Sequence, residues 1–169
     1  MSDTEIMDFV KLWRKSNPHI VGFWRKFQSD VIEVIETHKP KDSYCFKIYY
    51  EFGFLRILLP SGRSISYVRP HVEQNGRFQE VTYEGTNQET GHWGKLRIWG
   101  GKFLENVVQA IARDILCNAL GTLSRLNIPV VMHVHDECIC DVPKGKYPVD
   151  YINLVLCDLP NWCKDMTLS

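Results

Sequence analysis

Two neighbouring carboxylates, Asp136 and Glu137, lie between two short apolar runs of the chain. The flanking runs are typical of two strands, and a two-residue turn formed by the acidic pair holds both carboxylates at an exposed tip. Carboxylates in that position can coordinate a hard cation such as Mg²⁺, which takes oxygen ligands and keeps several waters. A polar turn without a metal explains the same residues, because turns favour polar side chains.

The same predicted hairpin offers a second kind of metal site. With the turn at Asp136 and Glu137, His135 lies opposite Cys138 and His133 lies opposite Cys140, so the four side chains share one face. Two histidines and two cysteines are suitable zinc ligands, although this spacing is not one of the usual zinc-finger or zinc-ribbon patterns. Packing of histidine and cysteine against neighbouring elements is the alternative that needs no metal.

A polar stripe follows one side of the longest helical pattern in the chain. Asn106, Gln109 and Arg113 stand at positions i, i+3 and i+7, which places them on one helix face. Amide and guanidinium groups can donate hydrogen bonds to the acceptors that every base pair presents in the minor groove. The stripe therefore suggests contact with duplex DNA that does not depend on sequence, and an ordinary solvated helix face is the alternative.

Two basic residues beside glycines are candidate phosphate contacts. Lys102 follows Gly100 and Gly101 at the start of the same helix, where backbone N–H groups can receive an anion. The segment falls far short of a P-loop, so a plain turn also explains it. Arg63 follows Gly62 in a predicted hairpin, where its guanidinium can reach a backbone phosphate.

Apolar periodicity predicts the helices that position these residues. Two helices occupy the first forty residues and are separated at Asn17-Pro18, with Asn17 as the cap of the second helix and Pro18 in its first turn. Residues 41–43 are predicted to be a loop. A strongly amphipathic helix runs from residue 102 to about residue 126, and a final helix covers residues 149–159.

Aromatic and β-branched residues predict an antiparallel sheet between the helices. The predicted strands cover residues 44–52, 54–59, 64–68, 77–84 and 93–99. A polar loop at residues 85–92 separates the last two strands. The pattern indicates an α+β fold in one domain, residues 1–169, with an N-terminal helix pair and the long helix packed on a sheet that carries the acidic hairpin.

The bulk composition is that of a globular protein. Among 169 residues, 44% are hydrophobic and 24% are charged, which excludes an intrinsically disordered chain. The formal net charge is zero, which argues against an independent nucleic-acid-binding protein with a basic surface. No apolar run is long enough to span a bilayer and the N-terminus is acidic, so a cytoplasmic protein without a membrane partner is expected. The six cysteines show no disulfide-framework spacing.

Two blocks of the sequence resemble family A DNA polymerases, the bacterial polymerase I type. The stretch MHVHDECICDVP, residues 132–143, is similar to motif C of that family, in which an apolar strand runs into a His-Asp-Glu turn. The stretch GGKFLENVVQAIARD, residues 100–114, resembles the helix that leads to motif C, especially in the phage-type branch. Further resemblance extends to residues 12–21, 53–68 and 158–162, so it covers nearly all of the chain.

The resemblance implies roles for individual residues. Asp136 corresponds to the motif C aspartate that binds the catalytic Mg²⁺ pair, Glu137 to its neighbour near the primer end, and His135 to a histidine at the primer terminus. The Asn106, Gln109 and Arg113 stripe corresponds to minor-groove contacts along the duplex. The implied chemistry is attack of a primer 3′-hydroxyl on a deoxynucleoside triphosphate, and the implied fold is the rear part of the polymerase palm.

The family's motifs A and B are not recognisable in these 169 residues. Motif A supplies the other metal-binding aspartate, and motif B supplies the helix that holds the incoming nucleotide. We therefore expect the chain to be catalytically inactive by itself and to need an N-terminal polymerase fragment for activity. A piece of a longer polymerase, half of a split enzyme and a decayed prophage remnant all fit this pattern. A non-catalytic module that grips duplex DNA is the alternative outside enzymes.

Overall fold

The computed structural model describes residues 2–76 and 78–168 of the chain. It divides into two compact units. Unit 1 consists of Met1–Leu59 and Ser64–Val107, and unit 2 consists of Pro60–Arg63 and Val108–Ser169. Among the described residues, no helix combines the length and the apolar character needed to cross a bilayer.

Unit 1 begins with the two predicted helices, α1 (Asp3–Ser16) and α2 (Pro18–Thr37). The predicted position of Pro18 in the first turn of α2 is confirmed. Proline is tolerated there because the first N–H groups of a helix have no partner within the helix. Asn17 is the N-cap residue of α2, as predicted, but its side chain makes no cap hydrogen bond to α2. The Asn17 amide instead donates to the carbonyl oxygen of Trp13 at 2.9 Å, where it satisfies a carbonyl at the end of α1.

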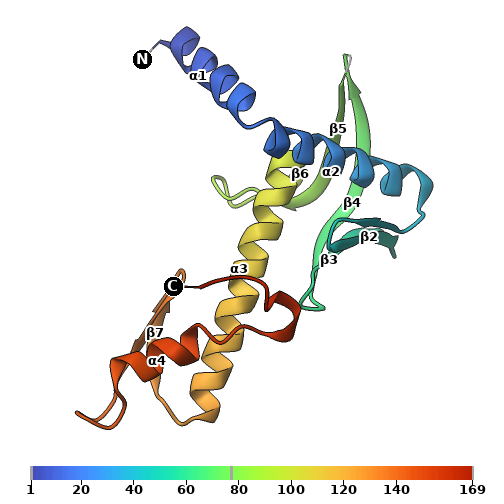
Figure 1. The fold of residues 1–169 in the computed structure, drawn as a ribbon. Helices are drawn as coiled ribbons and strands as arrows, with labels where there is room; N and C mark the ends of the chain where they lie inside the picture. The colour runs from blue at the N-terminus through green and yellow to red at the C-terminus, as the bar shows by residue number, and fades with distance from the viewer. Residues whose placement is uncertain (1, 77, 169) are drawn as a thin grey trace. The chain divides into compact units, whose positions relative to one another are not determined.

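A six-stranded antiparallel sheet follows the helix pair (Figure 1). Its strands pair in chain order, so every connection is a hairpin or a short loop. The strands are β1 (Lys41–Ser43), β2 (Phe46–Glu51), β3 (Phe54–Leu58), β4 (Ser64–Asn75), β5 (Phe78–Thr86) and β6 (Trp93–Ile98). The α+β class predicted from the sequence is confirmed.

The first strand corrects the prediction of a loop at residues 41–43. Tertiary contacts hold this short edge strand, because the buried carboxylate of Asp30 on α2 accepts hydrogen bonds from Ser43 Oγ at 2.6 Å and Lys26 Nζ at 2.6 Å. Lys41 Nζ lies 3.0 Å from the same carboxylate. Burial acts to raise the pKa of Asp30, but the hydrogen bonds from Lys26, Ser43 and Lys41 outweigh it and hold that pKa below its ordinary value.

The fourth strand is longer than predicted. The sequence pattern ends at Val68 because Arg69 and Pro70 interrupt it, yet β4 continues to Asn75. A bulge between Val68 and His71 absorbs the interruption, and Arg69 takes a positive φ of 43° there. A bulge leaves a residue outside the ladder, so the missing N–H of Pro70 costs no strand pairing. The predicted start of β5 at Arg77 lies outside the described residues.

The core of unit 1 lies between the sheet, α2 and the first two turns of α3 (Gly100–Arg125). Figure 1 shows α2 lying across the sheet. The largest fully buried side chains of this core are Phe27, Val31, Val34, Ile48, Leu55, Ile57, Val81, Phe103 and Val107. They come from both helices and from β2, β3 and β5, so burial of apolar surface joins helices and sheet into one unit. By contrast, α1 has no buried residue.

Unit 2 contains the C-terminal part of α3 and a separate two-stranded sheet, β7 (Val130–Val134) with β8 (Glu137–Cys140). The acidic hairpin is therefore not part of the six-stranded sheet, which corrects the prediction of a single sheet. The helix α4 (Val149–Leu156) lies beside the hairpin in Figure 1, and a 3-10 turn (Asn161–Cys163) follows it. The predicted end of this helix at residue 159 is thus three residues too late.

The core of unit 2 is small. Leu123, Ile128 and Val155 are its buried centre, and partly buried apolar side chains of the hairpin and α4 surround them. Most apolar side chains of α3 are at least partly covered, but Val108 is 63% exposed. Its position lies outside the buried stripe that Leu104, Val107 and Leu116 define.

Candidate metal-binding and nucleic-acid-binding residues

The tip of the β7–β8 hairpin differs by one residue from the prediction. His135 and Asp136 form the turn, Val134 pairs with Glu137, and His133 pairs with Cys138. The predicted turn at Asp136 and Glu137, with His135 opposite Cys138, is therefore wrong. The shift leaves Asp136 in the turn and makes Glu137 the first residue of β8.

A bulge lies at the other end of this hairpin, away from the turn. A bulge between Val130 and Met132 brings Val130 opposite Cys140, and both side chains pack against the core of unit 2. Without the bulge, the alternation of side chains along β7 sets Val130 on the solvent side. The sequence contains no glycine or other mark of a bulge at this point, so periodicity alone does not predict that Val130 is covered.

The register removes the geometric basis of the four-residue zinc site. Cys138 and Cys140 pack toward the core, whereas His135 lies in the turn and not opposite a cysteine. Burial, with the thiol of Cys140 beside it, raises the pKa of Cys138 and favours the protonated thiol, which is the form that does not bind zinc. Among the described residues, no group of three or more His, Cys, Asp or Glu is placed to hold a metal ion.

The two carboxylates at the hairpin are exposed and available. Asp136 and Glu137 are both open to solvent, and neither takes part in an ion pair within the described part of the chain. Two adjacent carboxylates are fewer ligands than a magnesium site usually draws from protein and substrate together. Among the described residues, this pair alone therefore does not make a metal site.

His135 has an uncommon backbone conformation. Its φ of 52° lies in the left-handed region, which a residue with a Cβ rarely adopts. Holding such a residue there costs on the order of 1–3 kcal/mol, and such residues cluster at functional sites. The first residues of the two-residue turns between β1 and β2 and between β2 and β3, Tyr44 and Phe52, also have positive φ, so hairpin geometry accounts for the conformation of His135.

Asn106, the first residue of the polar stripe, belongs to unit 1. It is half-buried, and its amide donates a hydrogen bond to the hydroxyl of Tyr67 on β4 at 3.0 Å. Burial raises the pKa of Tyr67 to about 12, and the hydrogen bond from Asn106 only partly opposes this rise. No sequence signal marks Tyr67 as a partner of the stripe, since an aromatic ring in a strand is typical of core packing.

Gln109 and Arg113 belong to unit 2 and have no such partner. Both side chains are exposed on α3, and within the described residues neither makes a side-chain hydrogen bond or an ion pair. Two donors that lie about one helical turn apart are therefore open to an external acceptor. This is the arrangement that the sequence predicted for a minor-groove contact.

The two candidate phosphate contacts are engaged within the chain. The Nε atom of Arg63 lies 2.7 Å from Asp114 Oδ1, and its guanidinium also donates to the carbonyl oxygen of Ala110 at 2.9 Å. Lys102 Nζ lies 2.8 Å from Glu105. Asp114 also accepts a hydrogen bond from Ser61, so it fixes the turn at residues 60–63 on α3. Sequence reasoning missed Asp114, whose signal is an acidic residue on the helix face that a Gly-Arg turn can reach.

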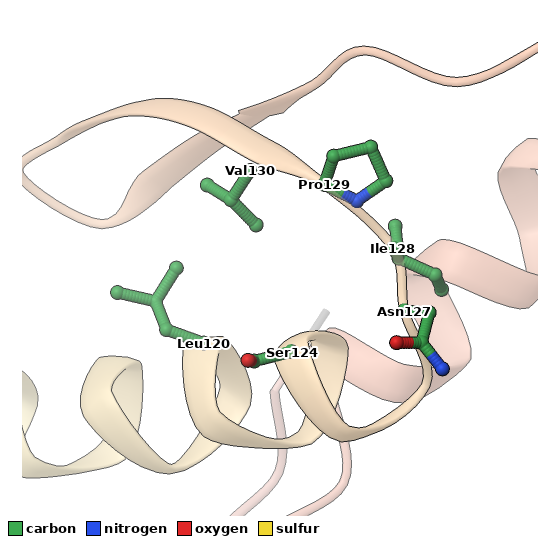
Figure 2. A pocket seen from close by; sticks show the side chains of 6 residues that line it. All are labelled: Leu120, Ser124, Asn127, Ile128, Pro129 and Val130. Atoms are coloured by element: carbon green, nitrogen blue, oxygen red, sulfur yellow. The ribbon is translucent and has the colours of Figure 1, made fainter.

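A hollow of about 410 Å³ lies between the end of α3 and the start of β7 (Figure 2). Its lining residues are Leu120, Ser124, Asn127, Ile128, Pro129 and Val130. Asn127 has a positive φ of 55° and ends the helix in the left-handed conformation that asparagine tolerates. The walls offer no titratable side chain, so the hollow is a packing feature of the helix-to-strand connection and not a chemical centre.

Comparison with known proteins relates the whole chain to one class of enzyme. A DNA polymerase of Bacillus phage SP02 is 39% identical over 172 aligned positions, which cover 100% of this chain and 26% of that polymerase. The chain thus spans about a quarter of the length of the curated relative that it matches. No protein-family model matches the chain, and no solved structure matches it. Over its full length, the chain is similar to part of a phage DNA polymerase.

Proposed function

We propose that the chain is part of the palm of a family A DNA polymerase and that residues 1–169 belong to that single domain. The observation that carries the proposal is the 39% identity to a phage DNA polymerase along the entire chain. The His-Asp-Glu segment at an exposed hairpin tip and the polar stripe on the preceding helix support the assignment to family A. The partners of such an enzyme are primer–template DNA and deoxynucleoside triphosphates.

Asp136 and Glu137 are the proposed carboxylates of a magnesium site. Their exposure and freedom from ion pairs among the described residues suit them to this role. Because the described residues complete no metal site, further ligands come from another part of a polymerase, such as an N-terminal fragment. A pair of magnesium ions bound there would stabilise the attacking and leaving oxygens of the reaction. The present residues contribute ligands, and His135 is proposed to contact the primer end.

Gln109 and Arg113 are the proposed minor-groove contacts. Both donors are unpaired among the described residues, so binding to DNA requires no bond within the chain to break. Asn106 is proposed to act in the same stripe, although its amide is already held by Tyr67. Arg63 and Lys102 remain proposed phosphate contacts that exchange or share their present acidic partners.

A duplex-binding measurement tests this assignment. We expect the purified chain to bind a labelled primer–template duplex weakly at low salt, with a dissociation constant on the order of 10⁻⁶–10⁻⁴ M, the range for non-specific contacts. Gln109→Ala and Arg113→Ala are each expected to weaken binding by roughly fivefold or more, since each removes a donor that contacts the duplex. Fluorescence anisotropy at several salt concentrations measures the change.

Arg125→Ala is the matched control for Arg113→Ala. Arg125 is also exposed on α3, but it lies roughly 120° around the helix from Arg113 and bonds to Thr122. Its loss is expected to leave duplex affinity within about twofold of the unaltered chain. Equal affinities for the Gln109, Arg113 and Arg125 variants contradict the proposed duplex face. Robust primer extension by the isolated chain contradicts the proposal that the metal site needs further polypeptide.

A further inference from the structure

Unit 1 contains a small cavity remote in sequence from the acidic hairpin. Its volume is about 180 Å³, and its walls are Arg14 from α1, several residues of α2, and Trp99 just ahead of α3. The α2 residues are Val21, Trp24, Arg25 and Gln28. The volume is well below the roughly 300–1,000 Å³ of a typical small-molecule pocket, so it suits one planar group and not a large ligand.

Three tryptophans form the aromatic part of this region. The rings of Trp13 and Trp24 are stacked, with centroids 5.6 Å apart and planes inclined by 16°. The ring of Trp99 meets Trp24 edge-on, at 5.4 Å and 88°. Trp13 is 46% exposed and Trp99 is 50% exposed. Large aromatic side chains are usually well covered, so half-exposed indoles at a cavity leave aromatic surface open to a ligand.

Two glycines and a glutamine hold the indole walls in place. A Cβ on Gly100 falls 2.1 Å from the carbonyl oxygen of Trp24, and a Cβ on Gly101 falls 2.1 Å from the ring of Trp99. Only glycine permits these close approaches. Gln28 accepts a hydrogen bond from the Gly100 N–H at 2.9 Å and so ties α2 to the start of α3. The Gly-Gly pair therefore builds the cavity by packing.

The charged side chains of the cavity are both arginines. Arg14 and Arg25 are exposed, and neither forms an ion pair within the described residues. Nearby lysines differ, because Lys11 is paired with Asp8 and Lys26 with Asp30. No carboxylate lines the cavity. Two unpaired guanidinium groups beside indole faces are suited to a ligand that has both a planar ring and an anionic group.

We propose that this cavity binds single-stranded DNA, with an unpaired base against Trp24 and Trp99 and the adjoining phosphates on Arg14 and Arg25. Stacking of bases on aromatic rings beside cationic side chains is the general mode of binding to single strands, and it depends little on sequence. The choice of DNA among ligands of this chemistry rests on the proposed polymerase function. The residues of this site are not among those proposed to contact the duplex.

Binding of a labelled thymidine oligonucleotide of about 12 nucleotides tests the proposal, with fluorescence anisotropy as the readout. Trp99→Ala is expected to weaken binding roughly tenfold, the scale for loss of one stacked base. Trp93→Ala is the matched control, because Trp93 is similarly exposed at 61% but does not line the cavity. The control is expected to change the affinity by no more than about twofold.

A variant that removes both guanidinium groups tests the proposal without removing a side chain that packs in unit 1. Trp99 packs on Gly101, so its loss can disturb unit 1, whereas Arg14→Ala/Arg25→Ala changes only exposed, unpaired side chains. This double variant is expected to reduce the slope of log affinity against log salt by about 1.4, the value for two fewer phosphate contacts on a single strand. Circular dichroism of each variant checks that the fold is retained.

The outcomes of these experiments distinguish single-strand binding at the cavity from duplex binding at Gln109 and Arg113. Loss of single-strand binding in the cavity variants, with no change in Gln109→Ala, supports the proposal even if duplex binding proves absent. The proposal is overturned if the folded arginine double variant binds the oligonucleotide as the unaltered chain does, or if the unaltered chain does not bind it at low salt. It is also overturned if thymidine monophosphate competes as effectively as the oligonucleotide, which assigns the cavity to free nucleotides.

Discussion

Tyr67 connects the packing of unit 1 with the polar stripe on α3. Its side chain is 4% exposed, its ring packs edge-on against Phe103 and Tyr83, and its hydroxyl accepts the amide hydrogen of Asn106. A buried hydroxyl without a partner is costly, so Asn106 stabilises the core as well as belonging to the stripe. The residue proposed to contact DNA is thus held by a buried tyrosine.

The raised pKa of Tyr67 predicts a loss of stability at high pH. The folded value is about 12 against an ordinary value of 10.0, so the stabilisation is full below pH 10 and is lost as the pH rises toward 12. The loss in free energy of unfolding is about 2–3 kcal/mol. Denaturation in urea at several pH values measures it. Tyr67→Phe is expected to flatten this part of the profile, whereas Tyr44→Phe, at an exposed ring, is expected to leave it unchanged. A profile that Tyr67→Phe does not alter shows that another group causes the decline.

At the scale of single residues, the sequence predicted which polar residues are exposed better than it predicted their partners within the chain. The exposed carboxylates and the unpaired Gln109 were foreseeable, because short polar runs between apolar ones lie at the surface. The engagement of Arg63 with Asp114 was not, because the two are far apart in the chain and their meeting depends on how a turn lies on a helix. Ion pairs of this kind follow from tertiary structure and have no local signal.

The start of α3 packs closely because two of its residues, Gly100 and Gly101, have no side chain. Gly100 lies where the backbone of α2 leaves no room for a Cβ, and Gly101 lies under the indole of Trp99. The sequence suggested either a phosphate-binding helix start or a plain turn at this point. The structure gives a third reason for the glycines, which is that they let the start of α3 pack closely against α2.

A pair of alanine substitutions tests this packing. Gly100→Ala is expected to lower the free energy of unfolding by about 1–3 kcal/mol, because its Cβ meets backbone atoms that cannot rotate away. Gly22→Ala, in the exposed middle of α2 with nothing within 4 Å of the new Cβ, is expected to raise it by about 0.4–1 kcal/mol. Thermal or urea denaturation measures both. Stabilisation by both substitutions is incompatible with close contact between α2 and the start of α3.

The predicted and observed hairpins also differ for a reason at the level of elements. Alternation of apolar residues predicted two strands and a tight turn, and both are present. The turn lies one residue earlier than predicted, and burial of Val130 beside Cys140 involves a bulge that the residue pattern does not indicate. The unpredicted continuation of β4 past Pro70 also involves a bulge, which lets the strand continue although Arg69 and Pro70 interrupt the residue pattern.

At the scale of the molecule, the sequence predicted the α+β class, the helix pair and the long helix. It did not predict that the acidic hairpin forms its own small sheet in a second compact unit. Strand pairing between distant segments depends on which faces become buried, and local pattern carries little information about it. Similarity to a quarter of a phage polymerase fits the proposal that Asp136 and Glu137 contribute ligands to a metal site that other residues complete.

Replacement of the aligned quarter of the similar phage DNA polymerase by residues 1–169 tests the central claim most directly. Primer extension with Mg²⁺ and deoxynucleoside triphosphates is measured for this chimera and for two variants. We predict that the chimera extends the primer and that Asp136→Asn slows extension by about 10²-fold or more, the scale for losing one charge-stabilising group from an active site. Asp141→Asn, at an exposed carboxylate just past β8, is predicted to retain activity. A folded chimera that extends primers equally well with and without the Asp136 carboxylate contradicts the assignment of this hairpin to the catalytic site.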